Sequence, residues 1–263
     1  MIETIDHGPV RELRLARPPV NALSPELIAA LGGAVRAAGE EAVEAQGGGQ
    51  PGQGVRALVL SGAPGMFSAG LDVPVLLSCD RPAMRTVWHD FYGLLRALAA
   101  SPLPVAAAIT GHSPAGGAVL SIFCDARIMA AGDYQIGLNE VAVGIAMPPV
   151  IHAALRRLIG SRQAERLCVS GAMLPAAEAL RIGLVDELAD GGRTVERAIG
   201  WAAEMLALPA AAMAATRRLA RADLVALFAA PDEEIERQLD SWFSPETQGT
   251  LRALVERLAA KRR

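Results

Sequence analysis

The 263-residue sequence predicts an α/β core that is followed by a helical C-terminal extension. Up to about residue 160, short apolar runs alternate with helical patterns, whereas after Ser161 only helical patterns follow. Apolar residues make up 52% of the chain, which is enough for a large core, but aromatic residues make up only 4%. We therefore expect a core of Ala, Leu, Val and Ile in which strands and helices come first and helices alone come later.

The first part of the chain contains four apolar runs short enough to be buried strands. Between them, Ser24 and Pro25 form a capping residue followed by a proline, a pair that begins helices. A second helix is predicted after Pro82, where apolar residues recur at steps of three and four, and we interpret this stripe as a packing face. The four strands are predicted at Val10–Leu15, 57–60, Val105–Ile109 and 126–129.

Helices dominate the remainder. They are predicted over 161–169, 175–182, 194–208 and 209–228. Ser244 and Pro245 repeat the cap-then-proline start and lead into a final amphipathic helix. We divide the chain into a core of residues 1–195 and a helical C-terminal region of residues 196–263. The glycine-rich stretch 47–54 is interpreted as a flexible surface connector within the core.

Charge and cysteine content exclude several classes of protein. The chain has 25 basic and 28 acidic residues, so it lacks the basic excess of a nucleic-acid-binding protein. Three cysteines lie far apart without a C-x-x-C pair, and the four histidines show no metal-ligand spacing, so we expect neither disulfides nor a metal. No signal peptide or membrane span is predicted. We expect a soluble, cytoplasmic protein that binds no nucleic acid and no membrane.

Two motif matches are rejected on their context. Gly47, Gly49 and Gly52 satisfy G-x-G-x-x-G, but they follow a predicted helix and precede a strand, the reverse of a dinucleotide-binding turn. Ser113 resembles a nucleophile elbow, but the next residue is Pro114, which has no N–H to donate to an oxyanion. Neither a dinucleotide site nor a serine hydrolase is predicted.

Two small-residue turns and one carboxylate point to a possible site. The turns are MFSAGLD (66–72) and GHSPAGG (111–117), and each follows a predicted strand, so that backbone N–H groups can approach a ligand closely. Gly116 and Gly117 would lie at a helix N-terminus, which favours negative charge. Glu140 lies within IGLNEV (136–141), among apolar residues. Taken singly, the turns could be ordinary tight turns and Glu140 could be a surface residue.

Together these segments resemble the crotonase (enoyl-CoA hydratase/isomerase) superfamily. The resemblance runs from PPVNALS (18–24) through FSAGLD (67–72), SPAGG (113–117), GLNE (137–140) and AEALRIGLVD (177–186) to the last helix. Within the superfamily the chain is most similar to the mitochondrial-type Δ3,Δ2-enoyl-CoA isomerases. The resemblance implies a crotonase-like spiral of ββα units with a helical C-terminal extension. It also implies a homotrimer or hexamer, in which residues 196–263 contribute to trimerisation.

The resemblance also implies the chemistry. The substrate is an acyl-CoA thioester, and because coenzyme A is part of the substrate, no separate cofactor is expected. The backbone N–H groups of Ala69 and Gly116 would hold the thioester oxygen, and Glu140 would move a proton from C2 to C4. Asp72 is expected to stabilise its turn near the pantetheine. The residues expected to contact the substrate are Ser68, Gly70, Leu71, Asp72, Val73, Gly117 and Asn139.

One substitution favours isomerisation over hydration. Hydratases of this family use two glutamates, and the first would fall at Val119, three residues after Gly116. Dienoyl-CoA isomerases also need an acid there and another near Pro148. We therefore predict an enoyl-CoA isomerase that converts 3-enoyl-CoA to trans-2-enoyl-CoA in fatty-acid β-oxidation. The alternatives are a hydratase or other crotonase-type acyl-CoA enzyme with an acid from a different loop, and an inactive acyl-CoA-binding module.

Overall fold

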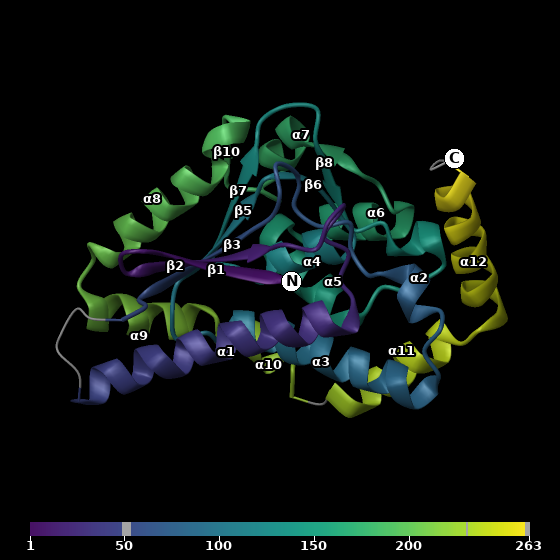
Figure 1. Ribbon diagram of the computed structural model, residues 1–263, viewed down its shortest axis with the longest axis horizontal. Coiled ribbons are helices and arrows are strands. Elements are labelled where there is room, and N and C mark those ends of the chain that lie inside the picture. The colour runs from purple at the N-terminus through teal and green to yellow at the C-terminus, as the bar shows by residue number, and fades with distance from the viewer. Residues whose placement is uncertain (49–53, 230, 261–263) are drawn as a thin grey trace.

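The computed structural model describes residues 1–48, 54–229 and 231–260 of the chain. Most of the predicted connector 47–54 lies outside these residues, so its interpretation stays a prediction. Figure 1 shows strands and helices alternating through the first part of the chain, with helices prevailing afterwards. This is the α/β order that the apolar runs predicted.

The main sheet has six strands in the order β1-β2-β3-β5-β7-β10. β1 and β2 form an antiparallel pair, and every other neighbouring pair is parallel. β3, β5 and β7 are buried at every position, as expected for parallel strands with both faces covered. All four predicted strands are confirmed. The strands are β1 (Ile2–His7), β2 (Val10–Leu15), β3 (Ala57–Ser61), β5 (Val105–Ile109), β7 (Ala126–Ala130) and β10 (Glu187–Ala189).

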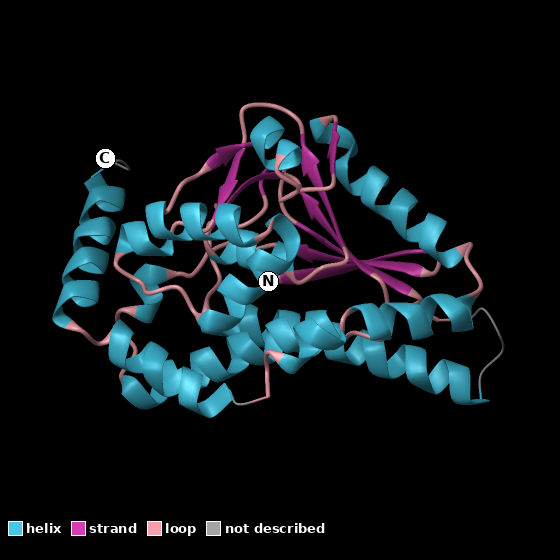
Figure 2. Cartoon of the chain, turned by 180° about the vertical axis from the view of Figure 1, so that it is seen from behind, coloured by secondary structure: helices cyan, strands magenta, loops and turns pink. Residues whose placement is uncertain are grey.

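Helices cover both faces of this sheet. On one face, Leu58 and Leu60 of β3 join the main core, to which α1 (Pro25–Gly48) and α3 (Arg81–Ala100) contribute their apolar stripes. On the other face, Val59 packs with Ala198 of α8 (Thr194–Leu206). Figure 2 shows the strands between a layer of long helices below them and one helix above them on the right. α8 spans residue 195, the predicted boundary, and packs on the sheet of the core. The division of the chain at that residue stays a prediction.

A second, smaller sheet has the order β4-β6-β8-β9. β4, β6 and β8 are mutually parallel, and they directly follow the large-sheet strands β3, β5 and β7. The backbones of β4 and β6 touch, since a Cβ on Gly111 would lie 2.0 Å from the Gly65 carbonyl carbon. Each turn of the chain thus adds one strand to each sheet before a helix. The small strands are β4 (Gly65–Met66), β6 (Gly111–Pro114), β8 (Gln135–Gly137) and β9 (Leu174–Pro175).

The predicted helix over 209–228 is in fact two helices. α9 (Ala210–Ala220) and α10 (Ala222–Ala226) meet at Arg221, whose buried guanidinium turns inward to donate to the Ala99 carbonyl at 3.0 Å and to pair with Asp125 at 2.9 Å. Three α-helices, α2, α5 and α11, were not predicted. The remaining helices are α2 (Val73–Leu76), α4 (Gly116–Ile122), η1 (Glu140–Val143), α5 (Pro149–Ile159), α6 (Ser161–Ser170), α7 (Ala176–Arg181), η2 (Gly191–Arg193), α11 (Pro231–Trp242) and α12 (Pro245–Ala260).

Among the described residues, no single helix is both long and apolar enough to cross a membrane. α8 and α9 reach those limits only when they are taken together, and the pair is bent by 110°.

Candidate active site

The three motifs meet because they end three neighbouring parallel strands. The first turn follows β4, the second follows β6, and Glu140 follows β8, and these strands are adjacent in the small sheet. Their carboxyl ends therefore open into one pocket of about 570 Å³. The pocket is completed by the segment from Arg17 to Ala22 and by side chains from α3 and α12. The structure thus brings the predicted turns and the predicted base together.

In the first turn, the free backbone donor is Leu71. The Ala69 N–H donates to the Val20 carbonyl at 2.9 Å. Leu23 forms hydrogen bonds with the two neighbours of Leu71. The Leu23 N–H donates to the Gly70 carbonyl at 2.8 Å, and the Leu23 carbonyl accepts the Asp72 N–H at 3.1 Å. Leu71 itself therefore points its N–H the other way, and in the described chain that N–H has no partner. This corrects the sequence prediction, which gave the donor role to Ala69.

In the second turn, the free donor is Gly116, as predicted. Ala115 takes a left-handed conformation with φ of 45°, and its N–H is held by the Gly137 carbonyl at 2.8 Å. Gly116 then begins α4, and its N–H has no partner among the described residues. A Cβ on Gly116 would lie 2.9 Å from Leu23 Cδ1 and 3.4 Å from the Leu71 nitrogen. Glycine is needed so that the two free N–H groups can lie side by side.

Glu140 is buried at the first position of the short helix η1. The residue is only 7% exposed, and its Oε2 atom has no hydrogen-bond partner in the described chain. Burial raises the pKa of Glu140 to about 7, although a hydrogen bond from its own backbone N–H acts in the opposite direction. A carboxylate with a pKa near neutrality is a stronger base than an ordinary glutamate and is still ionised in part at pH 7.

The other ionisable side chains that line the pocket neutralise each other. Asp72 pairs with Arg17 at 2.5 Å, and it also caps α2 by accepting the Val75 N–H at 3.4 Å. Both contacts hold the turn in place, which is the role expected of Asp72 from the sequence. Val119 and Pro148, which stand where hydratases or dienoyl-CoA isomerases of the family would carry a further acid, form part of the pocket wall. Of the described residues that line this pocket, only Glu140 is a carboxylate without an ionic partner.

The predicted substrate-binding residues divide into two groups. Leu71, Asp72, Val73 and Asn139 line the pocket. The other three, Ser68, Gly70 and Gly117, lie behind its wall and support the turns. Ser68 Oγ donates to the Asn21 carbonyl at 2.8 Å and accepts the Gly70 N–H at 3.2 Å, and a Cβ on Gly117 would lie 2.6 Å from the Ser68 carbonyl oxygen.

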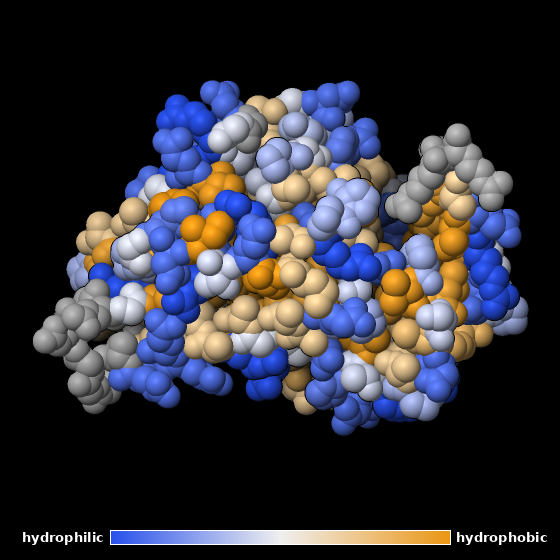
Figure 3. Space-filling view, viewed as in Figure 1, coloured by the Kyte–Doolittle hydropathy of each residue, from blue (hydrophilic) through white to orange (hydrophobic). Residues whose placement is uncertain are grey.

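The apolar end of the pocket was not predicted from sequence. Trp88 and Phe91 of α3 line it, although the sequence suggested only a packing face for this stripe. Leu254 and Leu258 of α12 form another wall, and apolar surface follows α12 in Figure 3. An amphipathic pattern shows that a residue faces inward, but it does not distinguish a filled core from a cavity, so no signal in the sequence could have identified these four residues.

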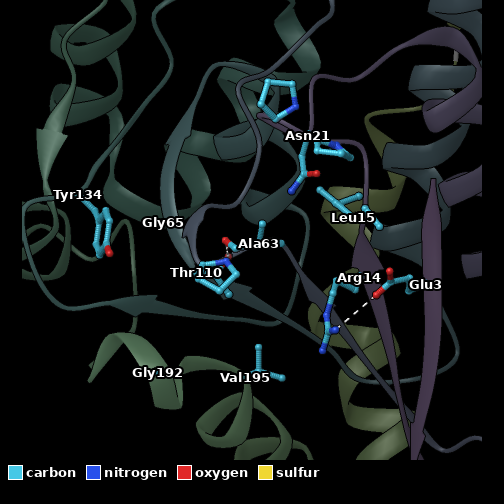
Figure 4. A pocket seen from close by; sticks show the side chains of 15 residues that line it. Glu3, Arg14, Leu15, Asn21, Ala63, Gly65, Thr110, Tyr134, Gly192 and Val195 are labelled. Carbon is cyan, nitrogen blue, oxygen red and sulfur yellow. Dashed lines mark hydrogen bonds and ion pairs between the residues drawn. The ribbon is translucent and has the colours of Figure 1, made fainter.

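A second cavity of about 580 Å³ (Figure 4) shares Pro18 and Pro19 with the first as lining residues. Its charged side chains are Arg14 and Glu3, which pair at 3.4 Å, and Arg14 also donates to buried Glu12 at 3.0 Å. The lining residues therefore provide no unpaired acid or base. Of these two cavities, the first therefore has the unpaired carboxylate, Glu140, that proton transfer requires.

Comparison with known proteins identifies the family. The family model for enoyl-CoA hydratase/isomerase matches residues 6–261. The chain belongs to the enoyl-CoA hydratase/isomerase family. It is 31% identical to human mitochondrial enoyl-CoA delta isomerase 1 over 95% of this chain and 80% of that protein. It is 32% identical to a probable enoyl-CoA hydratase of Mycobacterium avium over 84% of this chain and 80% of that protein.

The fold agrees with this membership. The crystal structure of human mitochondrial delta3-delta2-enoyl-CoA isomerase superposes with a TM-score of 0.90 at 28% identity, covering 99% of this chain and 98% of that one. The predicted crotonase fold is therefore confirmed. The protein is an enzyme of this family, and an acyl-CoA thioester fits the family as its substrate. Since relatives of similar identity are named isomerase and hydratase, membership alone does not select the reaction.

Proposed function

We propose that this enzyme is a Δ3,Δ2-enoyl-CoA isomerase, which moves the double bond of a 3-enoyl-CoA to give trans-2-enoyl-CoA. The observation that supports this most directly is that Glu140 is the one unpaired carboxylate among the described residues lining the pocket. A shift of one proton between two carbons needs a single group that can accept and return it. The addition of water instead needs one group that deprotonates the water molecule and a second that delivers a proton to the carbon.

The proposed reaction uses groups that the fold already holds in place. The thioester oxygen accepts hydrogen bonds from the N–H groups of Leu71 and Gly116, while Glu140 removes a proton from C2. The electron pair moves through C2, C3 and C4 as a dienolate whose negative charge rests on the thioester oxygen. Protonated Glu140 then returns the proton to C4. Coenzyme A is part of the substrate, so the step requires no other cofactor.

The pocket wall disfavours hydration. Val119 is 1% exposed and Pro148 is a ring without an ionisable group, so neither can hold or deprotonate a water molecule. Hydration remains the second candidate because relatives of similar identity are named hydratases. It would require an acid from elsewhere in the chain or from another subunit.

Two substrates separate the candidates. Incubation with 3-hexenoyl-CoA should give 2-hexenoyl-CoA without a gain in mass, and 2-hexenoyl-CoA should not gain the mass of water. Formation of 3-hydroxyhexanoyl-CoA at a comparable rate would instead support a hydratase. Binding of both thioesters without turnover would support an inactive acyl-CoA-binding module.

Variants connect the reaction to the proposed base. Glu140→Gln should abolish isomerisation, whereas Glu178→Gln, which alters a half-buried glutamate paired with Arg181, should not. Val119→Glu restores a carboxylate three residues after Gly116 and should allow water addition to 2-hexenoyl-CoA. An unchanged product pattern in Val119→Glu together with full isomerase activity in Glu140→Ala would refute the assignment.

We further propose a homotrimer or hexamer that works in the cytoplasm in fatty-acid β-oxidation. Val169 is 75% exposed and Val141 is 46% exposed, and such apolar surface is often covered by association. Analytical ultracentrifugation measures the mass of the particle directly, and a monomer at micromolar concentration would contradict the assembly.

A further inference from the structure

We propose that Thr247 of α12 is a positioning residue for Glu140, and that α12 couples the acyl end of the pocket to the base. The inference rests on the proposed role of Glu140 as the base. It is carried by a hydrogen-bonded path from α12 to the backbone of Glu140, and by the position of α12 as a wall of the same pocket.

One peptide group joins Thr247 to Glu140. Thr247 Oγ1 donates to the Gly144 carbonyl at 2.5 Å. The N–H of that same peptide group, which belongs to Ile145, donates to the Glu140 carbonyl at 3.0 Å. Hydrogen bonds at both ends of one peptide group polarise and strengthen each other. The path therefore fixes the turn that carries Glu140 against α12.

The Thr247 hydroxyl has one direction left in which to donate. Ser244 Oγ lies 3.0 Å from Thr247 Oγ1 and also accepts the Thr247 N–H at 3.2 Å, as the cap of α12. With Ser244 as donor to the Thr247 oxygen, the Thr247 proton is directed to Gly144. Thr247 is 3% exposed, so water cannot readily replace this bond.

Close packing supports the same contact. Gly144 ends η1 in a left-handed conformation with φ of 79°, and a Cβ there would lie 3.1 Å from Thr250 Cβ. Leu254 and Leu258 follow Thr247 by seven and eleven residues, a spacing that places all three near one face of α12. The helix face that holds the turn of Glu140 thus continues into the wall of the acyl pocket.

The carboxylate depends on this support because it has little of its own. Glu140 Oε2 has no hydrogen-bond partner in the described chain, so the side chain is placed by its backbone and its apolar surroundings. If the turn relaxes, water reaches the carboxylate and stabilises its charged form. The pKa of Glu140 should then fall from about 7 towards its ordinary value, and the carboxylate should become a weaker and less well aligned base.

The other ionisable groups near Glu140 should not obscure this change. Cys168 of α6 is affected by the charge of Glu140, but burial and that charge raise its pKa to about 11, so it stays neutral near pH 7. The Arg17–Asp72 ion pair lines the same pocket. Neither group is altered by a substitution at Thr247.

The test compares Thr247→Val, which keeps the shape and loses the hydroxyl, with Thr247→Ser, which keeps the hydroxyl. Thr250→Val is the matched control, since that hydroxyl donates within its own helix, to the Glu246 carbonyl at 3.0 Å. The infrared band of protonated Glu140 is identified by subtracting the spectrum of Glu140→Gln, and it is titrated without substrate. In parallel, kcat and KM are measured with 3-hexenoyl-CoA.

We expect a wild-type midpoint near 7 and a midpoint lower by about one pH unit in Thr247→Val. We also expect kcat to fall roughly tenfold with a smaller change in KM, because alignment is lost more than binding. Thr247→Ser and Thr250→Val should retain the wild-type midpoint and kcat. A folded Thr247→Val protein with the wild-type midpoint and kcat would overturn the proposal.

If Thr247→Val does not fold, Thr247→Ala provides the decision. It removes the hydroxyl that donates to the Gly144 carbonyl, so the midpoint must shift in the same direction, and an unchanged midpoint refutes the proposal. Because the titration needs no substrate, it remains informative if the wild-type protein fails to isomerise 3-hexenoyl-CoA. In that case the proposed function fails, while the role of Thr247 is judged from the infrared midpoint alone.

Discussion

Replacing Glu140 by glutamine should stabilise the folded protein at alkaline pH while it abolishes catalysis. Burial raises the pKa of Glu140 from 4.5 to about 7, a difference of about 2.5 units, which corresponds to about 3 kcal/mol. Because the folded-state pKa lies above the unfolded one, the folded state holds the proton more tightly. The contribution of this group to stability is therefore fully present below pH 4.5 and is lost as the pH rises through about 7.

Most of this loss falls in an accessible pH range. With these two pKa values, about 2.5 kcal/mol of the free energy of unfolding disappears between pH 5 and pH 8. Glutamine has no charge to desolvate, so the variant should escape this loss. Urea unfolding at both pH values and constant ionic strength should show Glu140→Gln to be more stable than wild type by about 3 kcal/mol at pH 8 and by less than about 1 kcal/mol at pH 5.

A second buried glutamate provides a control of opposite sign. Burial acts to raise the pKa of Glu12, but hydrogen bonds with Ser61 at 2.6 Å, His7 at 2.9 Å and Arg14 at 3.0 Å outweigh it, and the pKa is lowered. Glu12→Gln should therefore destabilise the protein at pH 8. If Glu140→Gln and wild type lose stability equally between pH 5 and pH 8, the carboxylate of Glu140 is solvated and the reasoning is refuted.

Three further predictions concern the reaction. The value of kcat/KM should rise with pH to a plateau with its midpoint near 7, because ionised Glu140 is the base, and a midpoint near 4.5 would contradict its burial. Gly116→Ala places a methyl group 3.4 Å from the Leu71 nitrogen and should lower kcat by about 10²-fold, whereas Gly93→Ala, with open space around its Cβ, should leave kcat unchanged in the same assay. Replacing the backbone N–H of Leu71 by an ester oxygen, through incorporation of the α-hydroxy acid, should lower kcat by about 10²–10³-fold. The same change at Ala69 removes only the bond to a carbonyl, so it should lower the melting temperature and spare kcat, and the reverse result would restore Ala69 as the donor.

The sequence by itself predicted four strands of the main sheet, the order of the motifs and the proposed base. Fully buried parallel strands appear as continuous apolar runs, so β3 and β5 could be recognised without a structure. The motif around Glu140 and the valine at position 119 could be recognised in the same way, because they depend on residue identity at fixed local spacing.

Only the tertiary structure decided which backbone groups are free and which side chains surround them. Ala69 and Leu71 look equivalent in a small-residue turn, and their difference depends on hydrogen bonds to the segment around Val20 and Leu23, more than forty residues earlier in the chain. The same holds for Glu140, whose burial arises when separate strands and α12 close around it. Hydrogen-bond partners and solvent exposure are properties of distant segments brought together. Local sequence can therefore nominate a catalytic residue, but it cannot supply the surroundings that set its pKa.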